Sequence, residues 1–373
     1  MTVRFAVVGC GVIGRLHAEV LAASAETAVS VLVDVDAAAA DALAQRLDPA
    51  PAVTTSLDGA LARDDVDAVA ICVPSGAHAR IAVAALESGR HVVVEKPVDV
   101  TIEAAAPIVT AAAAAPEGTV ATVISQHRFD PASVVVRDAI TAGRFGRLTS
   151  AVATVSWWRS QSYYDSGAWR GTWELDGGGA LMNQGVHTVD LLLWFLGTPV
   201  EVMAHTGLLA HERVEVEDTV AAVVRFQSGA LATLHATTAA YPGLSVRLQV
   251  LGDAGSAVID DDRLRYFHSR ELASAEAAGD AGVGADKGDR SDQTARVLPA
   301  EEEPDPAHGP MFTGHARQYR DIVEAIRTGR RPGVTLDDAL LALATVQAVY
   351  ESARSGAPVR VADVLAAVGV PAP

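Results

Sequence analysis

The chain has 373 residues, and 46 acidic against 29 basic side chains give it a formal net charge of −17. A surface this acidic repels the phosphates of nucleic acids and of anionic membranes, so neither is expected as a partner. Hydrophobic residues make up 50% of the chain, which is enough for two domain cores and too many for a disordered protein. The two cysteines, Cys10 and Cys72, are too few for a disulfide framework, and we expect both as free thiols.

Signals for export or membrane insertion are not visible in the sequence. The first residues enter an apolar run without a charged segment before it, which is not typical of a signal peptide. No stretch reaches the roughly 18 apolar residues of a membrane span. We therefore expect a cytoplasmic protein.

The first part of the chain, residues 1–125, alternates short apolar runs with longer helical patterns. The expected strands are Val3–Val8, Val29–Val33, Ala68–Val73, His91–Val94 and Val120–Ile124. The expected helices are Gly14–Ala23, Ala37–Leu47, Ala77–Glu87 and Ile102–Ala115. Nearly continuous apolar strands between helices predict an α/β fold, with a doubly wound parallel sheet of the Rossmann type covered on both faces.

The second part, residues 126–373, has a different pattern. Strands are expected at Leu148–Trp158, Val200–Thr206, Thr219–Phe226, Ala230–Thr238, Ser245–Leu251, Ala257–Ile259 and Leu264–Phe267. Helices are expected at Ala180–Leu196, Thr313–Thr328 and Leu336–Ser355, the last two able to pack back on the first domain. This order predicts an α+β domain with an open, mostly antiparallel sheet. The polar segment Ala273–Arg296 is expected to be mobile without ligand.

A glycine motif follows the first strand and opens the first helix. The segment Gly9–Gly14 contains Gly9, Gly11 and Gly14 with Val12 and Ile13, which is the spacing of a dinucleotide-binding turn. Its glycines allow a tight turn, a close approach to a pyrophosphate and close packing of helix on strand. Asp34 ends the second strand 20 residues after Gly14, where a carboxylate binds the adenine ribose and repels a 2′-phosphate. The motif predicts NAD rather than NADP, with Asp36 as a rival for the ribose.

Two further segments carry groups suited to hydride transfer. Lys96 follows the strand His91–Val94, at the edge of a parallel sheet where ligands bind, although it could also be a surface lysine paired with Glu95. Asn183 and His187 are four residues apart on a predicted helix and share one face. A polar pair on an apolar helix either faces a cleft or is a satisfied core pair. A lysine and a histidine could stabilise an oxyanion and exchange a proton.

Taken together, these motifs resemble the Gfo/Idh/MocA oxidoreductases, named after glucose–fructose oxidoreductase and inositol dehydrogenase. The resemblance covers essentially the whole chain. The segments that carry it are Gly9–Gly14, Asp34, Pro74–His78, Glu95–Pro97, Gln126–Phe129 and Gly177–Asp190.

The resemblance implies roles for individual residues. It makes Lys96 the active-site lysine and His187 the acid/base near the nicotinamide, and it adds Pro74, His78 and Glu95 to the cofactor site. The family usually has an aspartate where this chain has Asn183. An asparagine can orient the histidine through a hydrogen bond but cannot raise its pKa as a carboxylate would.

Substrate contacts are less sharply indicated. Arg128 could bind a substrate oxygen or form a salt bridge between the domains. Trp169 and Arg170, in the aromatic loop before the glycine run, suit a sugar ring. His78 could line the nicotinamide cleft or simply begin a helix. Eleven histidines show no recognised ligand spacing, so no metal is expected.

The sequence therefore favours an NAD-dependent oxidoreductase that acts on the secondary alcohol or ketone carbon of a sugar, polyol or sugar derivative. One alternative is a nucleotide-sugar dehydrogenase that keeps and recycles its NAD. Another is a non-catalytic NAD-binding regulator. A sheet with helices on one face predicts a homodimer or homotetramer paired through the other face, with Val220, Val224, Leu231 and Leu234 as candidate contacts.

Overall fold

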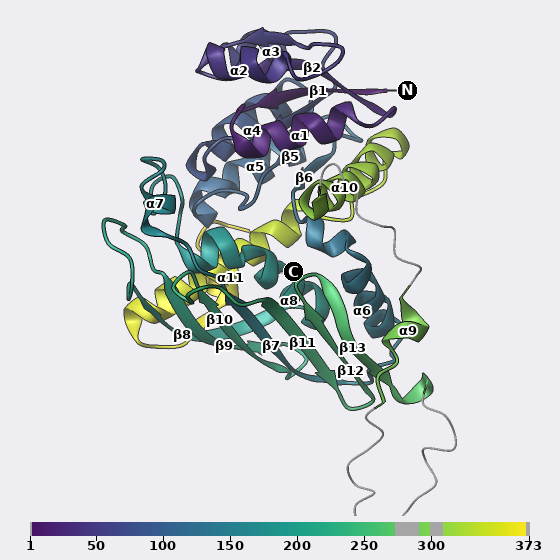
Figure 1. Ribbon diagram of the computed structural model, residues 1–373, viewed down its shortest axis with the longest axis vertical. Helices are drawn as coiled ribbons and strands as arrows, with labels where there is room; N and C mark the ends of the chain where they lie inside the picture. The colour runs from purple at the N-terminus through teal and green to yellow at the C-terminus, as the bar shows by residue number, and fades with distance from the viewer. Residues whose placement is uncertain (1, 273–290, 299–308, 371–373) are drawn as a thin grey trace, which may run out of the picture.

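The computed structural model describes residues 2–272, 291–298 and 309–370. Two sheets with their covering helices form the molecule (Figure 1). Most of the segment expected to be mobile, residues 273–290, lies outside the described part. The short helix α9 (Thr294–Val297) overlaps the end of that segment.

The first sheet is fully parallel, and its strand order is β3-β2-β1-β4-β5-β6. This order confirms the predicted Rossmann sheet. Its strands are β1 (Val3–Val8), β2 (Thr27–Val33), β3 (Ala52–Thr54), β4 (Ala68–Ile71), β5 (His91–Val94) and β6 (Ala121–Val123). Its helices are α1 (Val12–Ala22), α2 (Ala37–Ala44), α3 (Leu57–Leu61), α4 (His78–Glu87) and α5 (Ile102–Ala114). The sequence did not indicate β3 and α3, because both are short and β3 is only half-buried.

The second sheet is mixed, with strand order β13-β12-β11-β7-β10-β9-β8-β14. Its strands are β7 (Leu148–Ser156), β8 (Pro199–Gly207), β9 (Thr219–Phe226), β10 (Leu231–Thr237), β11 (Val246–Gly252), β12 (Gly255–Asp260), β13 (Arg263–Ser269) and β14 (Val359–Arg360). Among the described strands only β7 and β10 pair in parallel, so the predicted mostly antiparallel sheet is confirmed.

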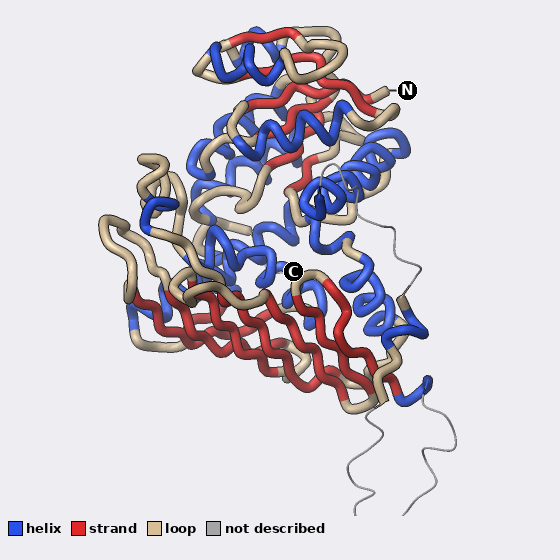
Figure 2. The backbone as a smooth tube through the Cα atoms, viewed as in Figure 1, coloured by secondary structure: helices blue, strands red, loops and turns tan. Residues whose placement is uncertain are grey.

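Helices lie between the two sheets and cover one face of the second (Figure 2). The remaining helices are α6 (Pro131–Thr141), α7 (Gln161–Tyr164), α8 (Val186–Leu196), α10 (Gly309–Thr328), α11 (Leu336–Ser355) and α12 (Val361–Ala366). Near the chain end, α10 packs on α1 and contributes Phe312, Tyr319 and Ile322 to the core on that side of the first sheet. The expected helix Ala180–Leu196 begins as a π-helix over Ala180–Gly185 and becomes α-helical only in α8.

The open face of the second sheet differs from the expectation. Val220, Val224 and Leu234 are buried under the helices, with exposed fractions of 0–1%. Side chains alternate along a strand, so their neighbours face outward instead. Leu231 and Val223 are half exposed, at 51% and 50%. Of the four residues named for subunit pairing, only Leu231 lies on the open face. Among the described residues, no helix is long and apolar enough to cross a membrane.

Candidate active site

The glycine turn has the geometry that a dinucleotide needs. Gly9 has a φ of +96°, and a Cβ there would lie 2.5 Å from the backbone oxygen of Cys72. A Cβ on Gly14 would lie 1.8 Å from the backbone oxygen of Gly9, so α1 can approach β1 only with glycine there. Gly11 is exposed, and a Cβ on it would meet no atom within 4 Å. The first turn of α1, with exposed Val12 and half-buried Ile13, therefore offers its amide groups to an approaching pyrophosphate.

The structure distinguishes the two candidate ribose carboxylates. Asp36 is the N-cap of α2, and its side chain accepts from the amides of Ala38 and Ala39. Asp34 lies at the end of β2, beside the glycine turn. Its two oxygens accept from the backbone amides of Cys10 (2.6 Å) and Asp36 (2.9 Å). Because each carboxylate oxygen has two lone pairs, Asp34 retains acceptors for ribose hydroxyls.

Lys96 follows β5 and joins the two domains. Its Nζ donates to the backbone oxygen of Asn183, on the π-helix, at 2.7 Å. Burial lowers the pKa of Lys96. The negative charges of Glu95 and Asp176 oppose this effect, whereas the positive charges of Arg159 and Arg170 reinforce it. The ammonium group is thus easier to deprotonate than that of a surface lysine. Pro74 lies exposed beyond β4, the neighbouring strand, at the same edge of the sheet.

His187 lies in the first turn of α8 and faces Lys96. The two side chains line a cavity of about 20 Å³ together with Ser125, Asp190 and apolar groups of α11. This volume is about that of one water molecule. Burial holds the pKa of His187 well below its ordinary value, and the charges of His127 and Lys96 lower it further. His187 is therefore a neutral imidazole.

Asn183 binds Lys96 through its backbone oxygen, whereas its side chain binds Asp176 and Gln184. Its Nδ2 donates to Asp176 Oδ1 at 2.5 Å, and its Oδ1 accepts from Gln184 at 3.1 Å. The expected hydrogen bond between Asn183 and His187 is not among the contacts of the described residues. Asp176 is buried, and burial raises its pKa, while Gly171 and Asn183 donate to it. Asp176 and Gln184 were not predicted as site residues.

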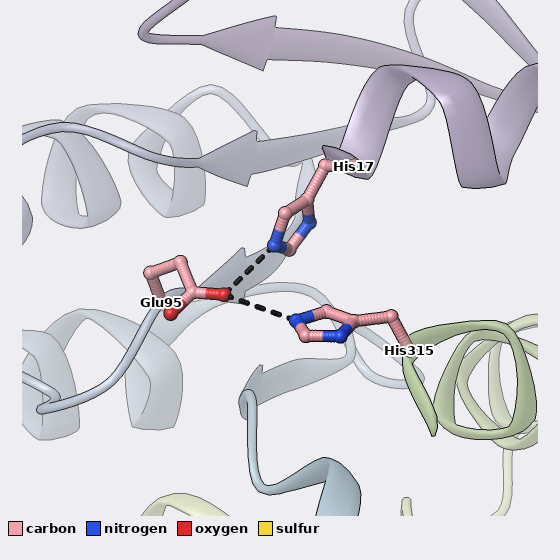
Figure 3. Close-up of side chains that lie close together, drawn as sticks. All are labelled: His17, Glu95 and His315. Carbon is pink, nitrogen blue, oxygen red and sulfur yellow. Dashed lines mark hydrogen bonds and ion pairs between the residues drawn. The ribbon is translucent and has the colours of Figure 1, made fainter. Parts of the chain in front are cut away.

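Glu95 points away from the cofactor edge into the interior. Figure 3 shows its carboxylate between His17 of α1 and His315 of α10. His17 Nε2 lies 2.8 Å from Glu95 Oε1 and His315 Nε2 lies 3.5 Å from it, while Glu95 Oε2 accepts from the backbone amide of Lys96. Although burial disfavours the charge, the two imidazoles hold the pKa of Glu95 well below its ordinary value. The carboxylate thus anchors the backbone of Lys96 and ties α10 to the first domain.

Among the residues that the structure describes, two sets of side chains have ligand atoms within 4.8 Å of one another and could hold a metal ion. They are His17, Glu95 and His315, and His127, Asp130 and Asp262. Each set is already held together by hydrogen bonds or ion pairs. Hydride transfer with NAD requires no metal, so neither set is needed for the reaction.

Arg128 is enclosed by carboxylates. Its guanidinium donates to both oxygens of Asp190, at 2.7 and 2.6 Å, and lies 3.3 Å from Asp338 of α11. Only 4% of Arg128 is exposed. This geometry favours the salt-bridge interpretation over substrate binding.

His78 is equally enclosed at the start of α4. It is 1% exposed, and its ring nitrogens lie 2.9 Å from the backbone oxygens of Pro97 and Val73. Its contacts hold the loop after Lys96 against α4. They leave no ring nitrogen for the nicotinamide.

The aromatic loop brings Arg170 between two rings. Its guanidinium lies 4.4 Å from the ring centroids of both Tyr163 and Trp169, and it donates to the Tyr163 hydroxyl at 2.8 Å. Arg159 lies 4.8 Å from the same tyrosine ring. Both arginines and Trp169 are half-buried. The loop therefore adds cations and aromatic faces beside the lysine.

Glu217 binds the start of the π-helix, and the sequence analysis did not predict it as a site residue. Its buried carboxylate accepts from the amides of Gly179 and Leu181, both at 2.8 Å, and from the Tyr350 hydroxyl at 3.1 Å. Burial raises the pKa of Glu217 to about 7, although these donors oppose the rise. The residue satisfies amides at the start of the segment that carries Asn183 and His187.

A parallel sheet with a glycine turn and a carboxylate at the end of β2, facing a second domain across a lysine and a histidine, defines a two-domain NAD-dependent oxidoreductase. The chain belongs to the Gfo/Idh/MocA oxidoreductases. Residues 3–122 match the family's NAD-binding Rossmann fold, and residues 134–258 match its C-terminal domain.

Individual relatives are moderately similar in sequence. An inositol 2-dehydrogenase of Rhizobium meliloti is 28% identical over 269 residues, which are 70% of this chain and 77% of the relative. The scyllo-inositol 2-dehydrogenase (NAD(+)) of Bacillus subtilis is 26% identical and covers 96% of both chains. A crystal structure of the WlbA dehydrogenase from Bordetella pertussis, in complex with NADH and UDP-GlcNAcA, superposes with a TM-score of 0.81 at 30% identity, covering 96% of this chain and 97% of that one.

Proposed function

We propose that this enzyme transfers a hydride between NAD and a secondary alcohol or ketone carbon of a sugar, a polyol or a sugar derivative. The observation that carries the proposal is the meeting of Lys96 and His187, from different domains, around one small cavity at the carboxyl edge of the first sheet. Ligands of doubly wound sheets bind at this edge. The names of the inositol dehydrogenases support a polyol or sugar as substrate.

The proposed roles follow from the two side chains' charges. Bound NAD supplies the hydride acceptor in the oxidation and the hydride donor in the reverse reaction. Lys96 stabilises the substrate oxygen as it loses or gains its proton. His187, which is neutral, accepts the hydroxyl proton in the oxidation and returns it in the reduction. The amide of Asn183 holds Asp176, and its backbone oxygen orients the lysine.

The cofactor contacts are proposed from the same edge of the sheet. Gly9, Gly11, Val12, Ile13 and Gly14 receive the pyrophosphate, and Asp34 binds the adenine ribose. Pro74 and Lys96 line the nicotinamide end. Glu95 and His78 act indirectly, since their side chains hold Lys96 and Pro97 in position.

A turnover screen that follows NADH absorbance tests the proposal. It covers inositols, aldoses, sugar acids and nucleotide sugars, each with NAD and, for the ketones, with NADH. Turnover of at least one member that is lost in Lys96→Ala supports the proposal. NAD binding without turnover of any member would favour the alternative of a non-catalytic regulator.

A second candidate function is a nucleotide-sugar dehydrogenase with retained NAD. The similarity to WlbA, whose structure contains NADH and UDP-GlcNAcA, favours it. Such an enzyme would be purified with reduced cofactor bound, and would need a second substrate to reoxidise it. The absorbance spectrum of the freshly purified protein distinguishes the two functions.

The assembly is proposed to be a cytoplasmic homodimer or homotetramer without a nucleic-acid or membrane partner. The open face of the second sheet carries half-exposed Val223 and Leu231, which pairing would cover. Light scattering at micromolar concentration tests this, and a monomer would contradict it. Leu231→Asp should weaken the assembly, because it introduces a charge at the pairing face.

A further inference from the structure

Two arginines beside the proposed reaction centre have no acidic partner in the part of the chain that the structure describes. Among the described residues, no carboxylate lies within 4 Å of the guanidinium of Arg159 or Arg170, although the chain carries a formal charge of −17. By contrast, Arg128, Arg213 and Arg247 each lie within 4 Å of at least one carboxylate. The Nε of Arg159 is buried without a hydrogen-bond partner. Arg159 and Arg170 thus place positive charge and hydrogen-bond donors beside the proposed reaction centre of an otherwise acidic protein.

The two arginines share one aromatic platform. Both guanidiniums lie against the ring of Tyr163, at 4.8 Å for Arg159 and 4.4 Å for Arg170. Each donates a single hydrogen bond from its guanidinium to a described residue, Arg159 to Gln184 Oε1 at 2.8 Å and Arg170 to the Tyr163 hydroxyl at 2.8 Å. Stacking on aromatic faces fixes the planes of the two groups while their remaining N–H groups stay available.

A continuous chain of hydrogen bonds connects this pair to Lys96. Gln184 Nε2 donates to the Tyr163 hydroxyl and to Asn183 Oδ1, both at 3.1 Å. The backbone oxygen of Asn183 in turn accepts from Lys96 Nζ at 2.7 Å. Arg159, Arg170 and Lys96 are close enough that the two arginines lower the pKa of the lysine. The buried Asp176 is the nearby counter-charge, and Gly171 and Asn183 already donate to it.

We propose that Arg159 and Arg170 form a subsite for an anionic oxygen group of the substrate, a carboxylate or a phosphate, beside the carbon that reacts. The inference rests on the proposed function and narrows it to acidic sugars and sugar phosphates. The planar guanidinium presents two parallel N–H groups to such an anion, and this match favours an anionic over a neutral sugar. The half-exposed position of both arginines lets a ligand reach them.

The test compares charged and neutral sugars in the wild type and in Arg159→Gln and Arg170→Gln. The probes are D-glucuronate, which carries a carboxylate, UDP-glucose, which carries phosphates, and the neutral D-glucose and myo-inositol. The kcat/KM for the anionic probe should fall roughly 10- to 100-fold in each variant, and by a clearly larger factor than the kcat/KM for a neutral probe in the same variant. Arg170→Lys should lose less kcat/KM for the anionic probe than Arg170→Gln, because lysine keeps the positive charge but lacks the two parallel N–H groups of the guanidinium. Arg247→Gln, whose arginine pairs with Asp260 on the second sheet, is the matched control and should behave as wild type.

A direct binding measurement separates this inference from the proposed function. Calorimetry titrates D-glucuronate or UDP-glucose into the protein saturated with NADH, and does not require turnover. Glucuronate binding that both variants weaken identifies a carboxylate site, and the same result with UDP-glucose identifies a phosphate site. Wild-type preference for D-glucose or myo-inositol, with both variants unchanged, would overturn the subsite and leave the oxidoreductase intact. Anion binding that the variants abolish, without turnover of any probe, would support the subsite and contradict the proposed reaction.

Discussion

The ring of His127 lies edge-on against the ring of His187, with centroids 5.0 Å apart and planes at 80°. His127 Nδ1 contacts Asp130 at 2.9 Å and Asp262 at 3.0 Å. Burial opposes the charge, but these two carboxylates raise the pKa of His127 to about 10. A charged imidazole thus faces the candidate acid/base. This contact, together with burial, keeps His187 neutral.

Removing the His127 charge should shift the pH dependence of the reaction. In the proposed oxidation neutral His187 accepts the proton, so kcat/KM should fall as the pH drops through the pKa of His187. His127→Gln removes one cause that lowers this pKa, so the acidic limb should move to higher pH. The pH profile of kcat/KM measures the shift. His205→Gln, at an exposed position of β8, should leave the profile in place. An unshifted limb in His127→Gln would show that His187 does not carry the proton.

Truncating either candidate catalytic side chain should affect turnover and spare cofactor binding. Lys96→Ala and His187→Ala are expected to lower kcat roughly 10²- to 10⁴-fold, the usual contribution of general acid–base catalysis. The dissociation constant for NAD should change little, because the proposed pyrophosphate site is the glycine turn and neither side chain belongs to it. Steady-state kinetics and calorimetry on the same preparations give both quantities. Near-normal turnover by Lys96→Ala would refute the proposed site.

Asn183→Asp should create repulsion with Asp176 rather than a carboxylate that pairs with His187. The new carboxylate would replace the amide 2.5 Å from Asp176, and two carboxylates so close cannot both ionise. We expect a lower melting temperature at pH 8 than the wild type, with the difference shrinking as the pH falls and one carboxyl takes up a proton. Thermal denaturation at several pH values tests this. Unchanged stability together with a shifted pH–rate profile would instead favour a direct interaction with His187.

Asp34 should decide the choice of cofactor. Asp34→Asn is expected to weaken NAD binding roughly 10-fold or more, since a charge-assisted acceptor for the ribose is lost, and to narrow the preference over NADP. Asp36→Asn is the matched control, because asparagine caps helix α2 as well as aspartate does. Calorimetric titration with NAD and NADP compares the variants. Equal or tighter NADP binding by the wild type would contradict the assignment.

Arg128 should matter for stability and only indirectly for turnover. Arg128→Gln leaves the buried carboxylate of Asp190 without its bidentate partner, which should reduce the free energy of unfolding by roughly 3–5 kcal/mol. Chemical denaturation measures this change. Arg225→Gln, at a half-exposed pair with Glu201, should have a much smaller effect. A stable Arg128→Gln with a raised KM would restore the substrate-binding interpretation.

The sequence by itself determined the features whose signals are local. Apolar periodicity located most strands of both sheets, and the matching bounds of α11 followed from its helical pattern. Gly9 and Gly14 were predictable because their conformations and contacts are dictated within one turn of chain. The position of Asp34 at the end of β2 was predictable from its distance to that turn, whereas its role stays a prediction. The short β3 and α3 gave no such signal, and neither did α6.

Only the tertiary structure decided which side chains meet. His127 follows β6 and Lys96 follows the neighbouring strand β5, so the position of His127 at the sheet edge could have been inferred from the strand order. Its contact with Asp262, 135 residues later, could not. Arg128 and Glu95 turn inward because buried carboxylates and imidazoles from distant helices satisfy them. The arginine pair on Tyr163 likewise depends on packing between loops. A sequence pattern specifies local conformation, whereas hydrogen bonds and charges between distant segments depend on how the folded elements are brought together.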